Sequence, residues 1–255
     1  MFEHQKIAVV MPAYNAEATL LKTYRQVIAC EMVDVVIIVD DGSSDNTAAI
    51  ASSLPRAIFH RIDRNRGYGG NQKVCYRLAL EAGADIIIMV HPDYQYTPLL
   101  IPAMCSMIGT GLYECVIASR ILGGRALAGG MPLYKYISNR FLTMVENLML
   151  GAKLSEYHTG YRAFSRRLLE KLPLAENSDD FIFDNQMLAQ IIWAGAVIAE
   201  VSCPTKYFAE ASSINFRRSL KYGLGCLNVG LEEWLCRNHL LRLPRYPESL
   251  RNCFR

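Results

Sequence analysis

Short apolar runs alternate with longer amphipathic stretches along the first 120 residues of the chain. Five runs rich in β-branched residues predict buried strands, at residues 6–11, 34–39, 57–60, 86–90 and 114–119. The stretches between them predict helices, at residues 16–30, 46–54 and 72–82 and from about residue 98. Strands that alternate with helices at this spacing predict a mostly parallel sheet covered by helices.

The second half of the chain predicts longer helices. A glycine-rich loop at residues 121–131 precedes a predicted helix at 132–150, and another helix is expected to end near Trp193. Extended segments are expected at 159–164 and 197–201. The 132–150 helix repeats apolar residues every three or four positions, which predicts a stripe facing the core. The members of this stripe are Leu133, Ile137, Phe141, Met144 and Leu148.

A second amphipathic helix is predicted from about residue 219. Its apolar positions recur at spacings of three and four, at Leu220, Leu224, Leu227, Leu231 and Trp234. We expect this stripe to pack on the domain or on a second subunit of a homo-oligomer, or to lie on an anionic membrane surface. Glycines at positions 223, 225 and 230 weaken an isolated helix, which favours the packed alternatives. Without internal repeats or a clear linker, we predict one domain at 1–218, followed by this helix and a tail at 219–255.

Composition and charge narrow the functional classes. The 255 residues are 51% hydrophobic and 20% charged, which is typical of a globular chain with a sizeable core. A formal net charge of +3 is too small for a protein that coats nucleic acid, so no nucleic-acid partner is expected. The eight cysteines include no CxxC pair, which indicates buried thiols in a reducing compartment. With no signal-peptide pattern and no apolar run of about 20 residues, we expect a cytoplasmic protein, at most peripheral to the inner face of the membrane.

The second predicted strand ends in an abrupt change of polarity. Aliphatic residues up to Val39 are followed by Asp40 and Asp41, and Asp45 completes three acids within a short turn. Helix capping needs one acid, so we expect a ligand crevice beyond the carboxyl end of this strand. The alternative is that Asp-Gly-Ser is ordinary loop chemistry.

The fourth predicted strand also ends in residues that can hold a ligand. His91 and Asp93 lie two positions apart, on one side of an extended segment. Carboxylate and phosphate oxygens are the ligands that Mg²⁺ and Mn²⁺ prefer, so Asp93 is predicted to bind such a cation beside a diphosphate. His91 either adds a nitrogen ligand or orients Asp93 through a hydrogen bond.

A glycine-rich turn follows the third predicted strand. Gly67-Tyr-Gly-Gly begins a helix, where backbone N–H groups could approach a phosphate, and Arg64 and Arg66 favour an anion nearby. A tight loop without a ligand is the alternative. The run lacks the spacing of a dinucleotide-binding fingerprint, and the sequence contains no Walker A motif.

Five segments carry a family resemblance. They are Met11-Pro-Ala-Tyr-Asn-Ala-Glu, the block from Val39 to Thr47, His91-Pro-Asp-Tyr-Gln, Thr159-Gly-Tyr-Arg-Ala-Phe and Phe183-Asp-Asn-Gln-Met. In this order they resemble family 2 glycosyltransferases of the GT-A fold, and most closely the dolichol- or polyprenyl-phosphate sugar synthase branch. The resemblance covers residues 6–225. It implies a single Rossmann-like α/β domain whose mostly parallel central sheet is flanked by helices.

The resemblance also implies donor-binding positions. Pro12, Ala13 and Tyr14 would border the nucleotide base and ribose. Asp41 would hydrogen-bond the base, because a carboxylate accepts the N–H groups of uracil or guanine well. Gly67, in the glycine-rich turn, is predicted as a further nucleotide contact.

Four further positions would serve the reaction. Asp93 would hold the cation that bridges the donor diphosphate, and Arg120 would face a phosphate of donor or acceptor. Arg162 is expected to be a structural ion-pair partner, with an acceptor role as the alternative. Asp184 is predicted as the catalytic base or as a carboxylate that positions the acceptor, with N-capping of its helix as the alternative.

The implied activity is inverting transfer of a sugar from a UDP- or GDP-sugar, dependent on Mg²⁺ or Mn²⁺. The expected acceptor is a polyprenyl phosphate or another lipid-linked group. The alternatives are a soluble acceptor and a catalytically silent subunit that binds a nucleotide sugar. The sequence departs from the family pattern at His91, which replaces the first Asp of Asp-x-Asp, at Glu156 in place of Asp, and at Gln186 in place of Glu.

Overall fold

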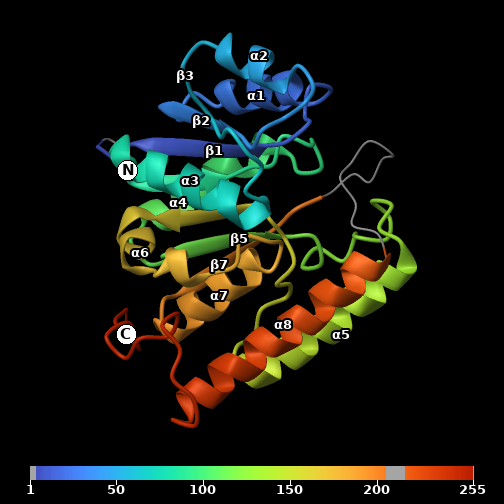
Figure 1. Cartoon of the computed structure of the whole chain (residues 1–255), viewed down its shortest axis with the longest axis vertical. Coiled ribbons are helices and arrows are strands. Elements are labelled where there is room, and N and C mark those ends of the chain that lie inside the picture. Colours follow the sequence, from blue (N-terminus) through green and yellow to red (C-terminus); the bar gives the residue numbers. More distant parts are fainter. Residues whose placement is uncertain (1–3, 205–215, 255) are drawn as a thin grey trace.

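The computed structural model describes residues 4–204 and 216–254, and a seven-stranded sheet in the order β3-β2-β1-β4-β6-β5-β7 forms its centre (Figure 1). The strands are β1 (Ile7–Ala13), β2 (Val35–Asp40), β3 (Ala57–Arg61), β4 (Ile86–Met89), β5 (Cys115–Ser119), β6 (Arg162–Ser165) and β7 (Ile198–Ser202). The helices are α1 (Leu20–Ile28), α2 (Thr47–Ser52), α3 (Tyr68–Glu81), α4 (Ile101–Gly109), α5 (Leu133–Leu150), α6 (Arg166–Lys171), α7 (Phe183–Trp193) and α8 (Phe216–Arg237), with short 3₁₀ turns η1 (Pro98–Leu100) and η2 (Leu174–Glu176).

The sheet is mostly parallel, as predicted. β1 pairs with β2 and β4, β2 with β3, and β5 with β7, all in parallel. β6 is antiparallel to β4 and β5 and lies between them, so Ala163 faces Ile88 on one side and Val116 on the other. The parallel strands therefore end at one edge of the sheet, where the segment that leads into β6 also arrives. Residues far apart in the sequence meet at this edge.

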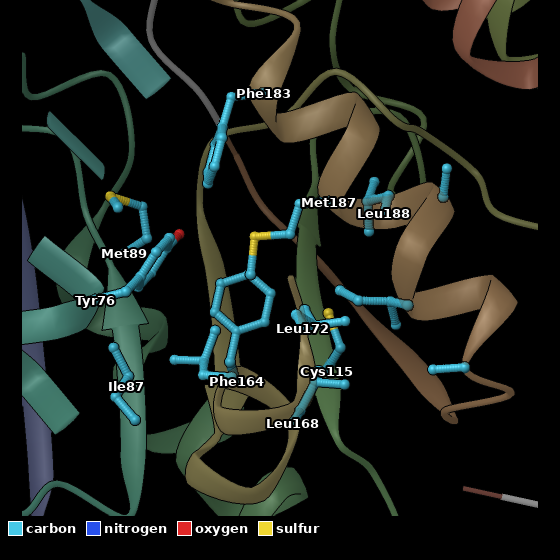
Figure 2. Close-up of a cluster of buried hydrophobic side chains, with 14 of the residues drawn as sticks. Tyr76, Ile87, Met89, Cys115, Phe164, Leu168, Leu172, Phe183, Met187 and Leu188 are labelled. Carbon is cyan, nitrogen blue, oxygen red and sulfur yellow. The ribbon is translucent and has the colours of Figure 1, made fainter. Parts of the chain in front are cut away.

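The strands form because their apolar runs are buried on both faces. Every residue of β1, β4 and β5 is buried, which is typical of strands in the middle of a covered parallel sheet. Alternate residues of each strand enter two separate cores. In the core of Figure 2, Phe164 of β6 lies between Met187 of α7 and Tyr76 of α3, whose ring it meets edge-on at 5.6 Å.

α5 and α8 lie side by side and run in the same direction (Figure 1). A Cβ atom on Gly223 would lie 3.6 Å from Leu142, and one on Gly230 would lie 2.9 Å from the Met149 sulfur. The contact advances by seven residues on both helices, as expected for a parallel pair. The approach at Gly230 is too close for a Cβ atom unless Met149 moves, whereas a Cβ on Gly223 would make an ordinary contact, so at least one glycine that weakens α8 in isolation serves its packing.

The prediction that the α5 stripe faces the core is wrong. Its five apolar side chains are exposed, from 55% at Phe141 to 83% at Leu148. The stripe of α8 is also exposed at Leu220, Leu224, Leu231 and Trp234, so it does not pack on this domain. A helical period identifies an apolar face but does not say what covers it.

Two further observations concern these helices. α8 begins at Phe216, slightly before the predicted start, so the predicted boundary at residue 218 falls inside the helix. No helix in the described ranges is both long and apolar enough to cross a bilayer.

Candidate active site

A cavity of about 820 Å³ lies beyond the carboxyl ends of β4 and β5, against α5 and α8. Its lining includes four of the predicted site residues, His91, Asp93, Arg120 and Asp184. The rest of the wall is largely apolar and comes from the two helices, through Phe141, Leu142, Leu220, Leu224 and Leu227. The fold thus gathers four site residues that are up to 93 positions apart in the sequence around one amphipathic cavity.

Asp184 lies on the cavity wall at the start of α7 and is held there by two side chains. Tyr68 Oη donates to Asp184 Oδ2 at 2.6 Å, and Gln72 Nε2 donates to Asp184 Oδ1 at 3.1 Å. Burial and the Asp184 charge raise the pKa of Tyr68 well above its ordinary value, so this phenol keeps its proton. The N-cap position of α7 is Ile182, which means that the capping alternative for Asp184 is wrong. Its carboxylate is instead oriented by residues of α3.

His91 is joined to this network through the same tyrosine. His91 Nε2 lies 2.9 Å from Tyr68 Oη, and the two rings stack with centroids 5.3 Å apart. Because Tyr68 gives its one proton to Asp184, it accepts from His91 Nε2, and a neutral His91 ring keeps its lone pair on Nδ1. Asp93 Oδ1 accepts from the backbone N–H of Gln95 at 3.1 Å.

Gly160 leaves the space that His91 occupies. A Cβ atom at this position would lie 2.3 Å from His91 Nε2 and 3.0 Å from Tyr68 Oη. Real Cβ atoms do not approach so closely, so any side chain here would displace the histidine. The glycine of the Thr-Gly-Tyr-Arg motif is therefore explained by a contact across the site.

Arg120 lines the cavity while it pairs with the fully buried Glu156. The Arg120 Nε and backbone N atoms each donate to the Glu156 carboxylate at 2.8 Å, and Nη2 donates to the His158 carbonyl at 2.7 Å. Burial alone raises the pKa of Glu156, but the Arg120 guanidinium outweighs it and holds that pKa below its ordinary value. Glu156, which replaces the Asp of the family pattern, thus serves as the partner that orients Arg120.

Arg162 is a structural residue, and the alternative that it contacts the acceptor is wrong. Its side chain is only 1% exposed and does not line the cavity. Its Nε, Nη1 and Nη2 atoms donate to the carbonyls of Thr159, Asp184 and Tyr157 at 2.7–2.8 Å. Nη1 also lies 3.8 Å from Asp184 Oδ1. One buried guanidinium therefore ties the start of β6 to the start of α7.

The predicted donor-binding residues lie at the ends of β1 and β2, outside the cavity lining. Pro12 and Ala13 close β1, and the next residue, Tyr14, is 55% exposed and presents its ring to solvent. Asp41 is buried, and its oxygens accept from the backbone N–H groups of Arg66 at 2.8 Å and Gly67 at 3.0 Å. Burial raises the pKa of Asp41, although both N–H groups oppose this.

The other two acids of the β2 turn, Asp40 and Asp45, have the structural roles of turn and cap residues that the sequence analysis considered as the alternative. Asp40 accepts from the backbone N–H of Ser43 at 3.2 Å and braces the turn. Asp45 accepts from the N–H of Thr47, the first residue of α2, at 3.0 Å. Asp41 is the remaining acid of the block, and it lies between the β2 turn and the loop that leads into α3.

Of the two interpretations of the Gly67 turn, its hydrogen bonds favour the tight loop without a ligand over the phosphate-binding one. The N–H groups of Gly69 and Gly70 are taken by the Asp179 carbonyl at 2.8 and 3.3 Å, and that of Gly67 by Asp41. A Cβ atom on Gly67 would lie 2.6 Å from the Asp179 carbonyl oxygen. The run is glycine-rich because the 178–179 segment packs on it.

Sequence reasoning missed a buried polar cluster beside the cavity. His158, which lines the cavity, places Nε2 3.3 Å from Glu146 Oε2, and Cys226 completes a group whose ligand-type atoms lie within 4.8 Å of one another. Burial raises the pKa of Glu146 to about 8 and lowers that of His158 to about 4. Both side chains are therefore neutral at pH 7, so they do not form an ion pair, and the two facing atoms make no hydrogen bond within the described residues. The sequence did contain a signal for this cluster. Glu146 lies on the same face of α5 as Asn139 and Thr143, and this polar face is the buried one.

Comparison with known proteins agrees with this geometry. The model of glycosyl transferase family 2 matches residues 8–173. The UDP-N-acetylglucosamine--dolichyl-phosphate N-acetylglucosaminyltransferase of Methanococcus voltae is 31% identical over 182 residues, which cover 65% of this chain and 72% of that protein. Polyprenol monophosphomannose synthase of Mycolicibacterium smegmatis is 26% identical over 209 residues, covering 77% and 76% of the two chains. The predicted resemblance to this branch is confirmed.

Solved structures agree on the fold. Glucosyl-3-phosphoglycerate synthase from Mycobacterium tuberculosis, crystallised with Mn²⁺, UDP and glucosyl-3-phosphoglycerate, superimposes with a TM-score of 0.68 over 94% of this chain and 82% of that chain. The sequence identity is 20%, so this likeness concerns the fold alone. The predicted GT-A architecture is confirmed, and since the family model matches well over half of its length, the chain belongs to glycosyl transferase family 2.

Proposed function

We propose that this glycosyltransferase moves one sugar from a UDP- or GDP-sugar to the phosphate of a polyprenyl phosphate. An acceptor phosphate oxygen attacks the anomeric carbon as the bond from that carbon to the donor diphosphate breaks. The nucleoside diphosphate leaves, and the new sugar–phosphate bond has inverted configuration.

The amphipathic cavity is the observation that carries the acceptor proposal. A polyprenyl phosphate has an ionised head and a long apolar tail. The cavity has Arg120, His91 and Asp184 on the sheet side, and on the α5 and α8 side a wall that is mostly aliphatic and aromatic but also includes Lys135, Ser138 and Asn139. Relatives named for dolichyl phosphate and polyprenol acceptors support the same class.

In this proposal Asp184 orients the acceptor. An ionised phosphate oxygen scarcely needs a base, so the carboxylate held by Tyr68 and Gln72 serves to align a singly ionised head group by accepting from its remaining P–O–H. Arg120 faces the acceptor phosphate, and its pairing with Glu156 keeps it in one orientation. Such positioning accounts for much of the rate enhancement in direct displacement reactions.

Asp93 and His91 fit a divalent cation, although they offer one carboxylate fewer than the family motif. Both line the cavity, and the lone pair on His91 Nδ1 is compatible with ligation. Mg²⁺ and Mn²⁺ accept few protein ligands when diphosphate oxygens and water complete the shell. Bound there, the cation would stabilise the charge of the leaving nucleoside diphosphate. The crystal structure of glucosyl-3-phosphoglycerate synthase, which shares this fold and contains Mn²⁺ and UDP, supports this assignment.

We assign the nucleotide to the ends of β1 and β2. Tyr14 offers an exposed ring beside the base, Pro12 and Ala13 form the adjoining backbone, and Gly67 borders Asp41. Each Asp41 oxygen that accepts one backbone N–H retains a second lone pair, which suits an N–H of uracil or guanine.

A transfer assay tests the proposal. Purified protein is incubated with radiolabelled UDP- and GDP-sugars, Mn²⁺ and polyprenyl phosphate in detergent, and label in the organic phase is counted. We expect transfer to polyprenyl phosphate and none to polyprenol or to 3-phosphoglycerate. Asp184→Asn should lower transfer by about 100-fold or more while nucleoside diphosphate affinity stays within twofold. The configuration of the product, measured by NMR, tests inversion.

Two outcomes would contradict the proposal. Transfer only to 3-phosphoglycerate or another water-soluble compound would indicate a soluble acceptor. Tight binding of a nucleotide sugar without turnover on any acceptor would indicate a silent subunit.

A further inference from the structure

α5 and α8 together present an extended apolar surface, here called the α5–α8 face. It consists of Leu133, Ile137, Phe141, Met144 and Leu148 of α5 and Leu220, Leu224, Leu231 and Trp234 of α8. Each of these side chains is at least 41% exposed, and the helices lie side by side (Figure 1). So many large apolar side chains gathered on one exposed surface are unusual for a monomeric soluble protein and mark an interaction site.

α5 reverses the arrangement of a soluble surface helix, because its inward side carries Asn139, Thr143 and Glu146. α8 buries Glu233 together with small and apolar residues and also exposes its leucines. The outward sides carry the leucines and aromatic residues. A helix in water normally buries its apolar stripe and exposes its polar one. This reversal indicates that the outward side meets an apolar environment.

The charges around the face favour an anionic lipid surface. Within the described side chains of α5 and α8, no carboxylate lies on the face, because Glu146 and Glu233 point inward and Glu232 pairs with Arg245 at 3.5 Å. At 100° per residue, Arg140 lies about 20° beyond Leu133 at the edge of the α5 stripe, and Lys221 lies about 60° beyond Leu224 on the side of α8 away from α5. Both cations are exposed, although Arg140 donates to the Ser155 carbonyl and Lys221 lies 3.6 Å from Asp180.

The face is continuous with the cavity. Phe141, Leu220 and Leu224 belong to the face and also line the cavity wall. A second copy of the chain seated on the face would cover these side chains and obstruct the cavity. A bilayer would instead let the cavity open onto lipid.

From these observations we propose that the α5–α8 face docks on the surface of an anionic bilayer without spanning it. The apolar side chains insert at the boundary between head groups and acyl chains, and Arg140 and Lys221 meet anionic head groups. Trp234 and Tyr134, which is 55% exposed, lie near opposite ends of the helix pair, as aromatic anchors do at membrane interfaces. The inference does not depend on the proposed reaction, since it concerns lipid in general.

Vesicle binding tests the docking surface without any acceptor or donor. Full-length protein is co-sedimented with phosphatidylcholine vesicles that contain or lack 30% phosphatidylglycerol. Leu148→Glu combined with Leu231→Glu places charges on the face at exposed positions outside the cavity lining. The matched control is Leu99→Glu combined with Leu112→Glu, since these leucines are 76% and 68% exposed elsewhere on the molecule.

We expect the wild type and the control to bind vesicles with phosphatidylglycerol, and the face variant to bind at least tenfold more weakly, on the order expected for two inserted leucines. The chain has two tryptophans, and Trp193 is buried, so a blue shift of emission on binding reports Trp234. Absence of vesicle binding by the wild type, or equal binding by the face variant, would overturn the inference. If light scattering shows that the wild type is a dimer, the face variant is a monomer and the wild type does not bind vesicles, the face would instead be assigned to a second copy of the chain. Transfer to detergent-solubilised acceptor can persist in either case, so failure of docking and failure of the proposed reaction are distinguishable.

Discussion

Glu146→Gln tests whether the buried carboxyl beside the cavity is neutral. Glu146 is fully buried, accepts from Asn185 Nδ2 and faces His158 Nε2 at 3.3 Å. Its pKa rises from an ordinary value of 4.5 to about 8, because burial disfavours the charged form. The folded protein therefore carries a neutral carboxyl at pH 7, which glutamine reproduces in shape and hydrogen bonding.

The sign of the pH dependence follows from this shift. The folded state holds a proton that the unfolded state releases, so the stabilisation from Glu146 is complete below pH 4.5 and is lost as pH rises through about 8. Each pKa unit corresponds to about 1.4 kcal/mol, so the wild type should lose roughly 3 kcal/mol relative to Glu146→Gln between pH 5 and pH 8. His158 acts in the opposite sense, because its pKa falls from 6.5 to about 4 and its stabilisation is lost as pH drops through that range. Both proteins contain His158, so the difference between them isolates Glu146.

The measurement is urea unfolding followed by circular dichroism at pH 5, 6, 7 and 8. We expect the two proteins to have similar free energies of unfolding at pH 5 and the variant to be clearly more stable at pH 8. Glu170→Gln, at an exposed position on α6, controls for the loss of one formal charge. Parallel curves for wild type and Glu146→Gln across this range would refute the assignment of a neutral buried carboxyl.

The remaining predictions concern the polar end of the cavity. Asp93→Asn should reduce the affinity for UDP or GDP in the presence of Mn²⁺ at least tenfold while leaving metal-free affinity unchanged, as measured by calorimetry; retained Mn²⁺-dependent affinity would remove Asp93 from the metal site. Gly160→Ala should lower transfer at least tenfold, because its Cβ would lie 2.3 Å from His91 Nε2 and displace the ring. Wild-type activity in that variant, with an unchanged melting temperature, would show that the position of His91 is unimportant.

The sequence predicted the fold well because its signals are local. Unbroken β-branched runs identified the buried strands, and the change of polarity after Val39 and Val90 marked the edge where functional residues gather. His91, Asp93, Arg120 and Asp184 were all expected at the site, and they line one cavity. Their convergence follows from strand order, because parallel strands end at the same edge.

Other features depend on contacts that no local pattern reveals. The apolar period of α5 identified a stripe correctly but not its direction, since burial depends on which face meets the domain. The Gly67 run resembled a phosphate loop, yet its N–H groups are taken by Asp179 and Asp41, from distant parts of the chain. Asp184 at a helix start suggested a cap, whereas Tyr68 and Gln72 hold its side chain on the cavity wall.

The Thr159–Arg162 motif shows how a family signature can support chemistry without performing it. Thr159 Oγ1 donates to the Ala118 carbonyl at 2.9 Å and joins this segment to β5. Gly160 provides the clearance for His91, and Arg162 binds three carbonyls, including that of Asp184. None of these three residues offers a free charge to a substrate, yet together they set the positions of His91 and Asp184, which both contact Tyr68 Oη. The motif therefore acts by positioning, which is why we assign the orientation of the acceptor to Asp184 and not to the arginine of the signature.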